Sequence, residues 1–566
     1  MFSDLLRGEI DTVLSSMGLS GVVFAIEHPT VITHGDFATN AAMVAAKAAG
    51  KNPRALAEEI VAALEAKKIV GIRTISIAGP GFINFTLDDS VFRDEVLRIG
   101  EEGMHYGEQH SWKGKKILVE HSSPNLFKPF HIGHLMNNAV GESIKRLAEF
   151  SGGSVTAISF PSDISLGIAK AVYVVAHDGI EKLHACTSEK EKLAYLGDCY
   201  VKGTQLYEES DTVKEEVRTI TETLFNGTQG EILSIFEECK RINLDYFVSI
   251  TSRLGSHFDA YIFESEAGKV GEELVHSHMD DIFKKSEGAI IYEGEQDDLH
   301  TRVFINKDGR PTYEAKDLGL LSLKFSRYEP DLSLFITDHE QTSHFDVVIA
   351  AAKKIDPVWG AHSVHRTHGR MTFKGQKMSS RLGGVPLASD IIDTLADEVR
   401  ERAQDLPVED VDAVAIGAVK FAILRAAAGK NINFDPETSL SFEGDSGPYL
   451  QYTAVRAHSV LRKAEAEGYT PCVGDCTCPE GEAALIEKML ARFPEVVRLA
   501  IEEWAPHHIA TYLLETAQAF NGWYGNTKIL DTGNPSIRYN LAVTKATTDV
   551  ITRGLQLLGI AMPSKM

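Results

Sequence analysis

The sequence predicts an α/β protein with a doubly wound parallel sheet, a helical insertion in that domain, a small α/β domain before it and an all-α helix bundle after it. Three features predict this fold. A strand, a loop, a helix and a second strand follow one another from residue 115, strand signals return after residue 301, and nearly every segment beyond residue 388 has helical periodicity. We expect the domains at 1–110, 111–388 and 389–566, with the insertion at about 170–292.

The first domain is expected to be a compact α/β unit. It opens with an amphipathic helix, HGDFATN leads into an Ala-rich helix, and NPRALAEEIVAALEAKKI has the apolar spacing of another helix. The segment ISIAGPGFINFTL predicts a pair of strands around Gly79, Pro80 and Gly81, because these residues favour a turn.

The second domain begins with the strand KKILVEHSS. SSPNLFKPF is an irregular loop with two prolines, HIGHLMNNAVGESIKRLAEFSG is a helix that ends at Gly152 and Gly153, and VTAISF is the next strand. A unit of this length predicts a right-handed parallel crossover, as in a Rossmann-like nucleotide-binding sheet. The insertion is mostly amphipathic helix, and TRVFIN, LSLFIT and the stretch leading to HGRMTF are expected to complete the sheet.

The last domain is expected to be a bundle of helices. Its periodic segments include IIDTLADEVRERA, VDAVAIGAVKFAILRAAAG, PYLQYTAVRAHSVLRKAEAEG, EAALIEKMLARF, PHHIATYLLETAQAFNGWYG and YNLAVTKATTDVITRGLQLLG.

Composition excludes several classes of protein. Hydrophobic residues make up 43% and charged residues 24% of the 566 residues, so the chain is not mainly disordered, collagen-like or a disulfide scaffold. The formal net charge of -23 disfavours indiscriminate binding to nucleic acid or anionic membranes, but a local basic groove can exist within it. A nucleic-acid partner would have to be recognised selectively.

The sequence favours a cytoplasmic protein without a membrane partner. Its six cysteines are too few for a disulfide framework, which favours a reducing compartment. The N-terminal segment reaches Asp4 and Glu9 too early for a signal peptide, and no apolar run is long enough to span a membrane. We expect a monomer.

His131 and His134 are the most informative residues. They stand three apart in the first turn of the predicted helix, beside backbone N–H groups that have no partner within the helix. The helix dipole and the imidazoles can stabilise charge on a triphosphate, and Gly133 lets a flat ring approach the backbone. No GxxxxGK[ST] loop occurs, so this would be the nucleotide site. Zinc ligation and a merely structural helix cap remain alternatives for this motif alone.

A second motif is the loop KGQKMSSRLGG, which carries Lys374, Lys377 and Arg381 among Gly and Ser. Mobile cations on such a loop suit a pyrophosphate leaving group, because their charge can close over it as the transition state forms. A loop of this composition alone is usually solvated surface.

Together the HIGH and KMSSR segments resemble the two signatures of class I aminoacyl-tRNA synthetases. The surrounding segments resemble the arginyl-tRNA synthetase family along the whole chain: HGDFATN and AGPGFINF, SSPNLFKPFHIGH, PTYEAKDL, and SFEGDSGPYLQYTAVR with the closing helices. The resemblance implies ATP-dependent attachment of L-arginine to its tRNA through an arginyl-adenylate, with release of AMP and pyrophosphate. It implies L-arginine, ATP with Mg²⁺ and tRNA as partners, and arginine activation that requires bound tRNA.

The resemblance also implies roles for individual residues. His131, His134, Lys128 and Lys377 would be catalytic. The expected ATP site is Lys128, His131, Gly133, His134, Lys377, Met378, Ser379 and Ser380. The expected arginine site is Glu120, Ser122, Asn125, His131, Tyr313, Asp317 and Gln341. The expected tRNA contacts are Phe82, Asn84, Tyr449, Tyr452, Arg456 and Met566. Periodicity alone would instead put Tyr313 and Asp317 on an exposed helix face and both C-terminal tyrosines in the bundle core.

Two departures from the family pattern affect these expectations. Ser380 stands where the usual KMSKS loop has a second lysine, and Lys128, three residues before His131, is expected to substitute for that lysine at the phosphates. PSDISLGIAK replaces the run Asp-Trp-Gly-Thr-Gln-Phe-Gly of many bacterial members and retains Asp163.

The cysteines in PCVGDCTCPE lack a nearby fourth ligand, so we expect a loop of free thiols and no structural metal. Two rival functions stay open. Another class I synthetase, of the cysteinyl or glutamyl type, would not need the set Asn125, Tyr313, Asp317 and Gln341. A tRNA-binding paralogue without activity is disfavoured by the intact signatures.

Overall fold

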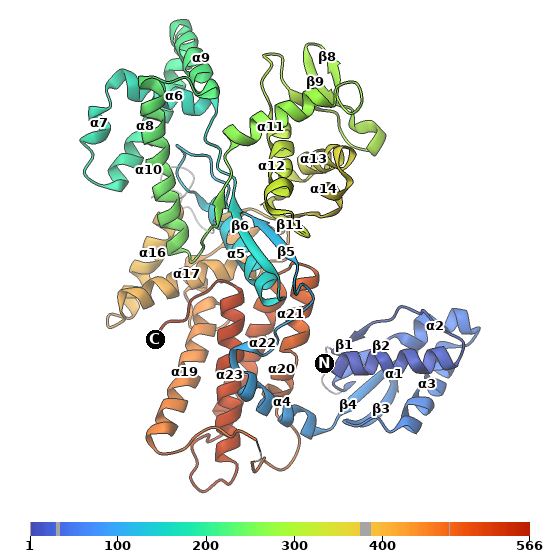
Figure 1. Cartoon of the computed structure of the whole chain (residues 1–566). Coiled ribbons are helices and arrows are strands. Elements are labelled where there is room, and N and C mark those ends of the chain that lie inside the picture. The colour runs from blue at the N-terminus through green and yellow to red at the C-terminus, as the bar shows by residue number, and fades with distance from the viewer. Residues whose placement is uncertain (1, 30–33, 374–386, 475) are drawn as a thin grey trace. The chain divides into compact units, whose positions relative to one another are not determined.

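A computed structural model describes residues 2–29, 34–373, 387–474 and 476–566. The chain forms two compact units, whose elements are labelled in Figure 1. The first unit comprises Met1–Gly107, Thr453–Arg498 and Tyr512–Arg553. The second comprises Glu108–Tyr452, Leu499–Thr511 and Gly554–Met566.

The N-terminal part of the first unit is an antiparallel sheet with strand order β1-β2-β4-β3, packed against helices. The predicted strand pair is confirmed, because β3 and β4 pair with Ala78 opposite Phe82 across the turn. Buried Leu6, Ile60 and Phe85 belong to the core between the helices and the sheet. The elements are α1 (Phe2–Ser16), β1 (Ile26–Glu27), β2 (Phe37–Thr39), α2 (Ala41–Ala49), α3 (Pro53–Lys67), β3 (Ile72–Ala78) and β4 (Phe82–Leu87).

The C-terminal third is helical, as predicted. Its elements are α16 (Ala388–Arg402), α17 (Val408–Leu424), β14 (Ile432–Phe434), α18 (Pro436–Ser439), α19 (Gly447–Ala466), α20 (Leu485–Ala491), α21 (Phe493–Glu502), α22 (His507–Asn526) and α23 (Ile537–Leu557). Parts of α19 to α23 belong to the first unit, together with α4 (Asp89–Glu102) and the 3-10 helix Gly103–His105. Periodicity predicts that a segment is a helix, but it does not predict which elements the helix packs against. Our domain boundaries stay predictions.

The second unit contains a five-stranded parallel sheet with strand order β12-β11-β5-β6-β7. The strands are β5 (Lys116–Glu120), β6 (Ser154–Ser159), β7 (Ala260–Tyr261), β11 (Leu332–Asp338) and β12 (Ser363–His368). Strands β6 and β7 lie on one side of β5, and strands β11 and β12, which come later in the chain, lie on the other side. The doubly wound fold is confirmed, and its switch point lies between the carboxyl ends of β5 and β11, where such sheets bind ligands.

Two details of the predicted sheet are wrong. TRVFIN forms β10 (Arg302–Ile305), which belongs to a separate antiparallel sheet with β9 (Ala289–Tyr292) and β8 (Lys284–Ser286). The predicted insertion is not wholly outside the sheet, because β7 lies within its range. A two-residue strand has no periodicity to detect. The HGRMTF segment contributes β13 (Met371–Phe373), which pairs with β14.

Two groups of helices rise from the sheet, on the left and right of Figure 1. The left group has its own apolar core and comprises α6 (Leu166–Asp178), α7 (Glu181–His184), α8 (Glu189–Glu209), α9 (Asp211–Asn226) and α10 (Glu231–Arg253). The right group comprises α11 (Glu264–Ser277), α12 (Tyr313–Tyr328), α13 (Thr342–Ile355) and α14 (Pro357–Ala361), with the 3-10 helices Gly294–Asp297 and His339–Gln341.

Glycines fix the close crossing of α11 and α12. A Cβ on Gly271 would lie 1.8 Å from the carbonyl oxygen of Ala315, and one on Gly319 would lie 2.0 Å from that of Ala267. Any larger side chain would force the helices apart, so these glycines allow α11 and α12 to pack closely against each other. Across the described residues, no helix combines the length and apolar character needed to cross a membrane.

Candidate active site

The histidine motif caps helix α5 (Ile132–Phe150), which follows β5 and its loop. His131 is the N-cap, and its Nδ1 accepts from the backbone N–H of Gly133 at 3.1 Å. In return, the N–H of His131 donates to Nδ1 of His134 at 3.2 Å. The two rings stack with centroids 3.9 Å apart. The motif therefore forms a rigid, reciprocal cap at the edge of the sheet.

This arrangement fixes the protonation of both rings. Each Nδ1 accepts a hydrogen bond, so each neutral ring carries its proton on Nε2. Burial, the neighbouring His131 and Lys128 lower the pKa of His134 to about 3. Burial and Lys128 also lower the pKa of His131. The pair presents two neutral N–H donors beside the positive end of the helix dipole, a combination suited to phosphate oxygens.

The chain returns to this cap directly after the second signature. The backbone of Leu387 pairs with His131, and the N–H of Ala388 donates to the carbonyl oxygen of Phe130 at 2.9 Å. Lys374, Lys377, Met378, Ser379, Ser380 and Arg381 lie outside the described residues. Leu387 and Ala388, which follow this segment in the sequence, lie beside the histidine cap.

The loop between β5 and α5 is held by buried partners. Ser122 and Phe127 have left-handed backbones, with φ of 56° and 66°, and such non-glycine residues persist only where their surroundings fix them. The N–H of Phe127 donates to Oδ1 of Asn243 on α10 at 3.0 Å. Lys128 is exposed, and its Nζ lies 5.4 Å from the ring centroid of Tyr200 on α8. The helical insertion thus supports the loop that carries Lys128.

A buried polar network ties the switch point together. Oδ1 of Asn137 accepts from the N–H of Ser122 at 2.6 Å, and its Nδ2 donates to the carbonyl oxygen of Ile336 at 2.7 Å. The Ser122 hydroxyl contacts Nδ1 of His121 and accepts from Nδ2 of Asn138. Asn137 therefore joins the ends of β5 and β11. The buried Ser122 side chain is part of this network, and its expected role at the arginine site stays a prediction.

Helices α12 and α13 form a second wall. Tyr313 at the start of α12 is 61% exposed, and Asp317 lies one turn later on the same face. Oδ2 of Asp317 accepts from Nε2 of His344 at 2.6 Å, and the other ring nitrogen of His344 is 3.4 Å from Oε1 of Glu314. Gln341, one turn before His344, is exposed at the start of α13. This wall brings together the predicted Tyr313, Asp317 and Gln341.

The other predicted carboxylate, Glu120, is buried at the end of β5 and paired with Lys324 of α12. Burial outweighs the attraction of Lys324 and raises the pKa of Glu120. The charge of Asp317 on α12 raises the same pKa further. Asn125, in contrast, is exposed on the loop. Glu120 is thus committed to an internal ion pair, which the sequence did not reveal.

Asp163, the retained residue of the divergent segment, has a defined role in the fold. Its Oδ2 accepts from Nζ of Lys240 on α10 at 2.8 Å, and Oδ1 accepts from the N–H of Ser265 on α11 at 2.9 Å. The segment therefore links both helical groups even without the aromatic residue and the glutamine of many relatives.

Comparison with known proteins identifies the family. Residues 96–435 match the family "tRNA synthetases class I (R), catalytic domain", residues 450–566 the "DALR anticodon binding domain" and residues 4–87 the "Arginyl tRNA synthetase N terminal domain". The arginine–tRNA ligase of Clostridium perfringens is 30% identical over 560 residues, which are 97% of each chain. That of Lactobacillus acidophilus is 30% identical over 576 residues, 100% of each chain.

The chain belongs to the arginyl-tRNA synthetase family. Solved arginyl-tRNA synthetases share its fold. The Thermus thermophilus protein has a TM-score of 0.79 at 23% identity, and the Plasmodium falciparum protein has a TM-score of 0.80 at 16% identity. Each match covers 100% of this chain, and 100% and 99% of the respective relatives. The predicted family and fold class are confirmed.

The structure separates the residues expected to contact tRNA in this synthetase into exposed and buried groups. Phe82 is half-buried on β4, whereas Asn84 is only 6% exposed, which leaves little surface for RNA contact. Tyr452 on α19 is 38% exposed, so it is not bundle core, and Tyr449 is half-buried. The guanidinium of Arg456 lies 3.9 Å from the ring centroid of Tyr524. Met566 is half-exposed.

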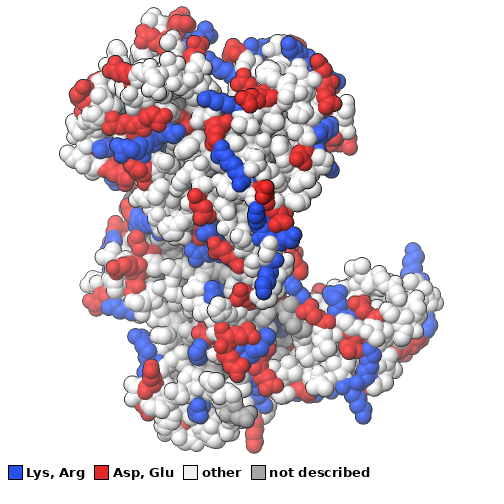
Figure 2. Space-filling model, in the orientation of Figure 1, with Lys and Arg blue, Asp and Glu red and all other residues white. Residues whose placement is uncertain are grey.

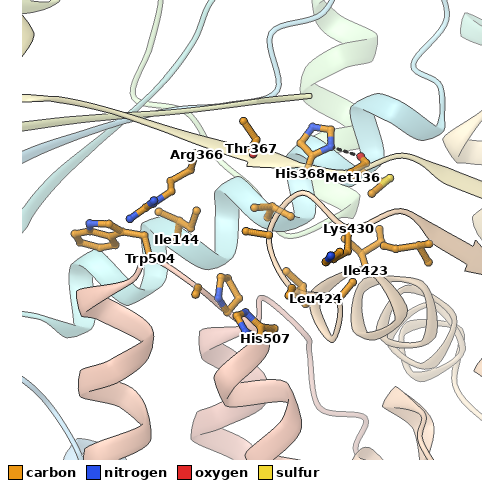
Figure 3. A pocket seen from close by; sticks show the side chains of 18 residues that line it. Met136, Ile144, Arg366, Thr367, His368, Ile423, Leu424, Lys430, Trp504 and His507 are labelled. Carbon is orange, nitrogen blue, oxygen red and sulfur yellow. Dashed lines mark hydrogen bonds between the residues drawn. The ribbon is translucent and has the colours of Figure 1, made fainter. Parts of the chain in front are cut away.

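A small cavity lies along α5, away from the histidine cap (Figure 3). Met136 and Ile144 of α5, Arg366 of β12, and Trp504 line a space of about 30 Å³. His368, whose Nδ1 donates to the carbonyl oxygen of Gly369 at 2.8 Å, borders it. The volume suits about one ordered water rather than a substrate of this synthetase.

One expectation about the cysteines is wrong. Cys472 and Cys476 form a disulfide, with Cα atoms 6.2 Å apart, while Cys478 remains a free thiol. The loop brings two thiols within the range that a disulfide spans, which spacing alone could not establish. In the part of the chain that the structure describes, no group of three or more His, Cys, Asp or Glu side chains is arranged to hold a metal ion.

Proposed function

We propose that the switch point of the sheet carries out ATP-dependent attachment of L-arginine to tRNA in two steps. By its family, the enzyme is an arginine–tRNA ligase of class I, which uses ATP. In the first step, the arginine carboxylate attacks the α-phosphorus of ATP and pyrophosphate leaves. In the second, a ribose hydroxyl at the 3′ end of tRNA attacks the arginyl-adenylate and AMP leaves. No covalent bond to the protein forms, so positioning and charge stabilisation supply the catalysis.

The single observation that carries this proposal is the reciprocal histidine cap. The Nε2–H groups of His131 and His134 would donate to phosphate oxygens as negative charge grows on them, and the N-terminus of α5 would add its dipole. Because both rings are stacked and hydrogen bonded at Nδ1, they need little reorganisation during the reaction. Gly133 keeps the space above the helix start open for the nucleotide.

Lys128 and Lys377 would hold the pyrophosphate end of ATP. Lys128 lies three residues before His131 in the loop that leads to the cap. Its positive charge lowers the pKa of both histidines. Leu387, at the end of the segment that includes Lys377, pairs with His131. Mg²⁺ would arrive bound to ATP as part of the substrate.

The wall formed by α12 and α13 would select arginine. A guanidinium has planar N–H donors that match the two oxygens of a carboxylate, and Asp317 would supply this carboxylate. The phenol of Tyr313 and the amide of Gln341 would provide further polar contacts. Oδ1 of Asp317 has no hydrogen-bond partner within the described ranges, so it can accept from a substrate. Asn125 would reach the substrate from the loop, and Glu120, through its ion pair with Lys324, would hold α12 against the end of β5.

The domains at the two ends of the chain would contact tRNA. Acidic and basic side chains are interspersed on the face that Figure 2 shows, which favours selective rather than purely electrostatic binding. Tyr452 and its neighbour Tyr449 would stack on bases of the anticodon, Arg456 would meet a phosphate, and Met566 would lie near them. Phe82 would contact tRNA from the N-terminal sheet, and Asn84, two residues later on β4, would add only its small exposed surface. We further propose a cytoplasmic monomer.

The decisive experiment is charging of transcribed arginine tRNA with each of the twenty amino acids in turn. Arginine alone should be attached, and only with ATP present. Attachment of glutamate or cysteine would favour another class I synthetase, and tRNA binding without charging would favour an inactive paralogue.

A further inference from the structure

His344 is a titratable group beside Asp317 that the proposed reaction steps do not use. It lies on α13, three residues after Gln341, and it was not among the residues predicted from the sequence. Its side chain is only 17% exposed, between helices α12 and α13. Its position raises the question of what an imidazole does between two carboxylates at a cation-binding site.

The geometry around His344 is restrictive. Nε2 lies 2.6 Å from Oδ2 of Asp317, and Nδ1 lies 3.4 Å from Oε1 of Glu314. Phe345 meets the ring edge-on, with centroids 4.9 Å apart and planes at 88°. Contacts at both nitrogens and from the side leave the ring a single orientation. One carboxylate oxygen of Asp317 is therefore committed to His344, and the direction of the other oxygen is set.

The charges around the ring favour its protonated form. Burial alone would lower the pKa of His344, but Asp317 and Glu314 outweigh it and raise the pKa to about 9. His365 on β12 is kept neutral, because burial and the charge of His344 lower its pKa to about 4. A guanidinium nitrogen of Arg302 on β10 lies 3.7 Å from Oε1 of Glu314, the same oxygen that faces Nδ1 of His344. An imidazolium thus allows two carboxylates one turn apart on α12 to stay ionised.

We infer that His344 is a positioning residue for arginine: it holds Asp317 by one oxygen so that the other faces the guanidinium of the substrate. This inference rests on the proposed function, since it deepens the role given there to Asp317. His344 itself would not contact the substrate.

The test is a double-mutant cycle on arginine binding. In aminoacylation with saturating ATP and tRNA, His344→Ala should raise the KM for arginine by about tenfold or more, because an ionic hydrogen bond that orders Asp317 is lost. The KM for ATP should stay within about twofold. In the Asp317→Asn background, His344→Ala should add less than about threefold, since residues that act as a unit are not additive. Lys353→Gln, which removes one positive charge from an exposed position on the same helix, is the matched control and should leave both KM values unchanged.

Several outcomes would overturn the inference. An unchanged arginine KM in His344→Ala, or a full tenfold effect on top of Asp317→Asn, would show that His344 does not act through Asp317. If His344→Ala does not fold, His344→Gln keeps an N–H donor for Asp317 and should bind arginine better than His344→Asn, whose shorter amide cannot reach; equal KM values would contradict the inference. A wild-type enzyme that fails to charge tRNA with arginine would instead refute the proposed function.

Discussion

The histidine cap gives His131 two separable tasks, and substitution can divide them. Its Nδ1 caps helix α5 by accepting from Gly133 N–H, while its Nε2–H is free to donate to a phosphate. His131→Ala removes both. His131→Asn removes the imidazole donor but keeps a cap, because Asn is among the best N-cap residues and its side-chain oxygen can accept the same bond.

The two losses have different sizes. Removing one donor to charge that develops in a transition state typically costs about 3 kcal/mol, or about 10² in rate. Losing an N-cap costs about 1 kcal/mol of unfolding free energy. Both variants should therefore slow ATP–pyrophosphate exchange by about 10², whereas only His131→Ala should lose about 1 kcal/mol of stability in denaturant titration.

The assay is pyrophosphate exchange with tRNA present, followed across pH. Because burial and Lys128 lower the pKa of His131 and of His134, both rings are neutral at physiological pH and should remain the working donors as pH rises. The wild-type rate should not fall as pH rises from about 6 to 8, the range where an ordinary histidine loses its charge. A fall in that range would mean that imidazolium is required. If the His131→Asn enzyme catalyses pyrophosphate exchange at the wild-type rate, His131 acts only as a structural cap.

The remaining predictions concern four other sites. Asp317→Asn should raise the arginine KM by a factor equivalent to about 1.5–3 kcal/mol and leave the ATP KM unchanged, and an unchanged arginine KM would return Asp317 to an ordinary helix surface. Lys324→Met should cost about 3–5 kcal/mol of unfolding free energy because it leaves Glu120 buried without its cation, whereas adding Glu120→Gln should recover much of that loss; equal stability of single and double variants would contradict the ion pair. Lys128→Ala should impair ATP-dependent charging at least as much as Lys377→Ala, and a normal Lys128→Ala enzyme beside an inactive Lys377→Ala enzyme would show that the loop lysine suffices. Tyr452→Ala should raise the tRNA KM with a stacking loss of about 1–3 kcal/mol and little change in melting temperature, and the reverse pattern would place the ring in the core.

Local signals account for the parts of the structure that the sequence predicted. The strand pair around Gly79–Gly81, the crossover from β5 through α5 to β6, and the C-terminal helices each follow from periodicity and turn residues within one short segment. The position of the histidine cap could also be predicted, because a residue at the N-cap and one three positions later face each other at the start of a helix.

Long-range contacts explain what the sequence did not reveal. The pairing of Glu120 with Lys324, the junction made by Asn137 and the contact of His344 with Asp317 each join segments that only the folded chain brings together. Strand β7 is too short to show alternation, and β10, which was expected in the parallel sheet, pairs with β9 in a separate antiparallel sheet. The signal that could have found His344 is its spacing, one helical turn after Gln341, but this spacing alone does not identify its partner.

The most direct test of the whole site is a structure of the enzyme with a non-hydrolysable arginyl-adenylate analogue. We expect the guanidinium within hydrogen-bond distance, about 3 Å, of Oδ1 of Asp317, and phosphate oxygens at the same distance from Nε2 of His131 or His134. His344 should still hold Oδ2 of Asp317. A guanidinium bound away from α12, or a phosphate that does not approach the N-terminus of α5, would contradict it.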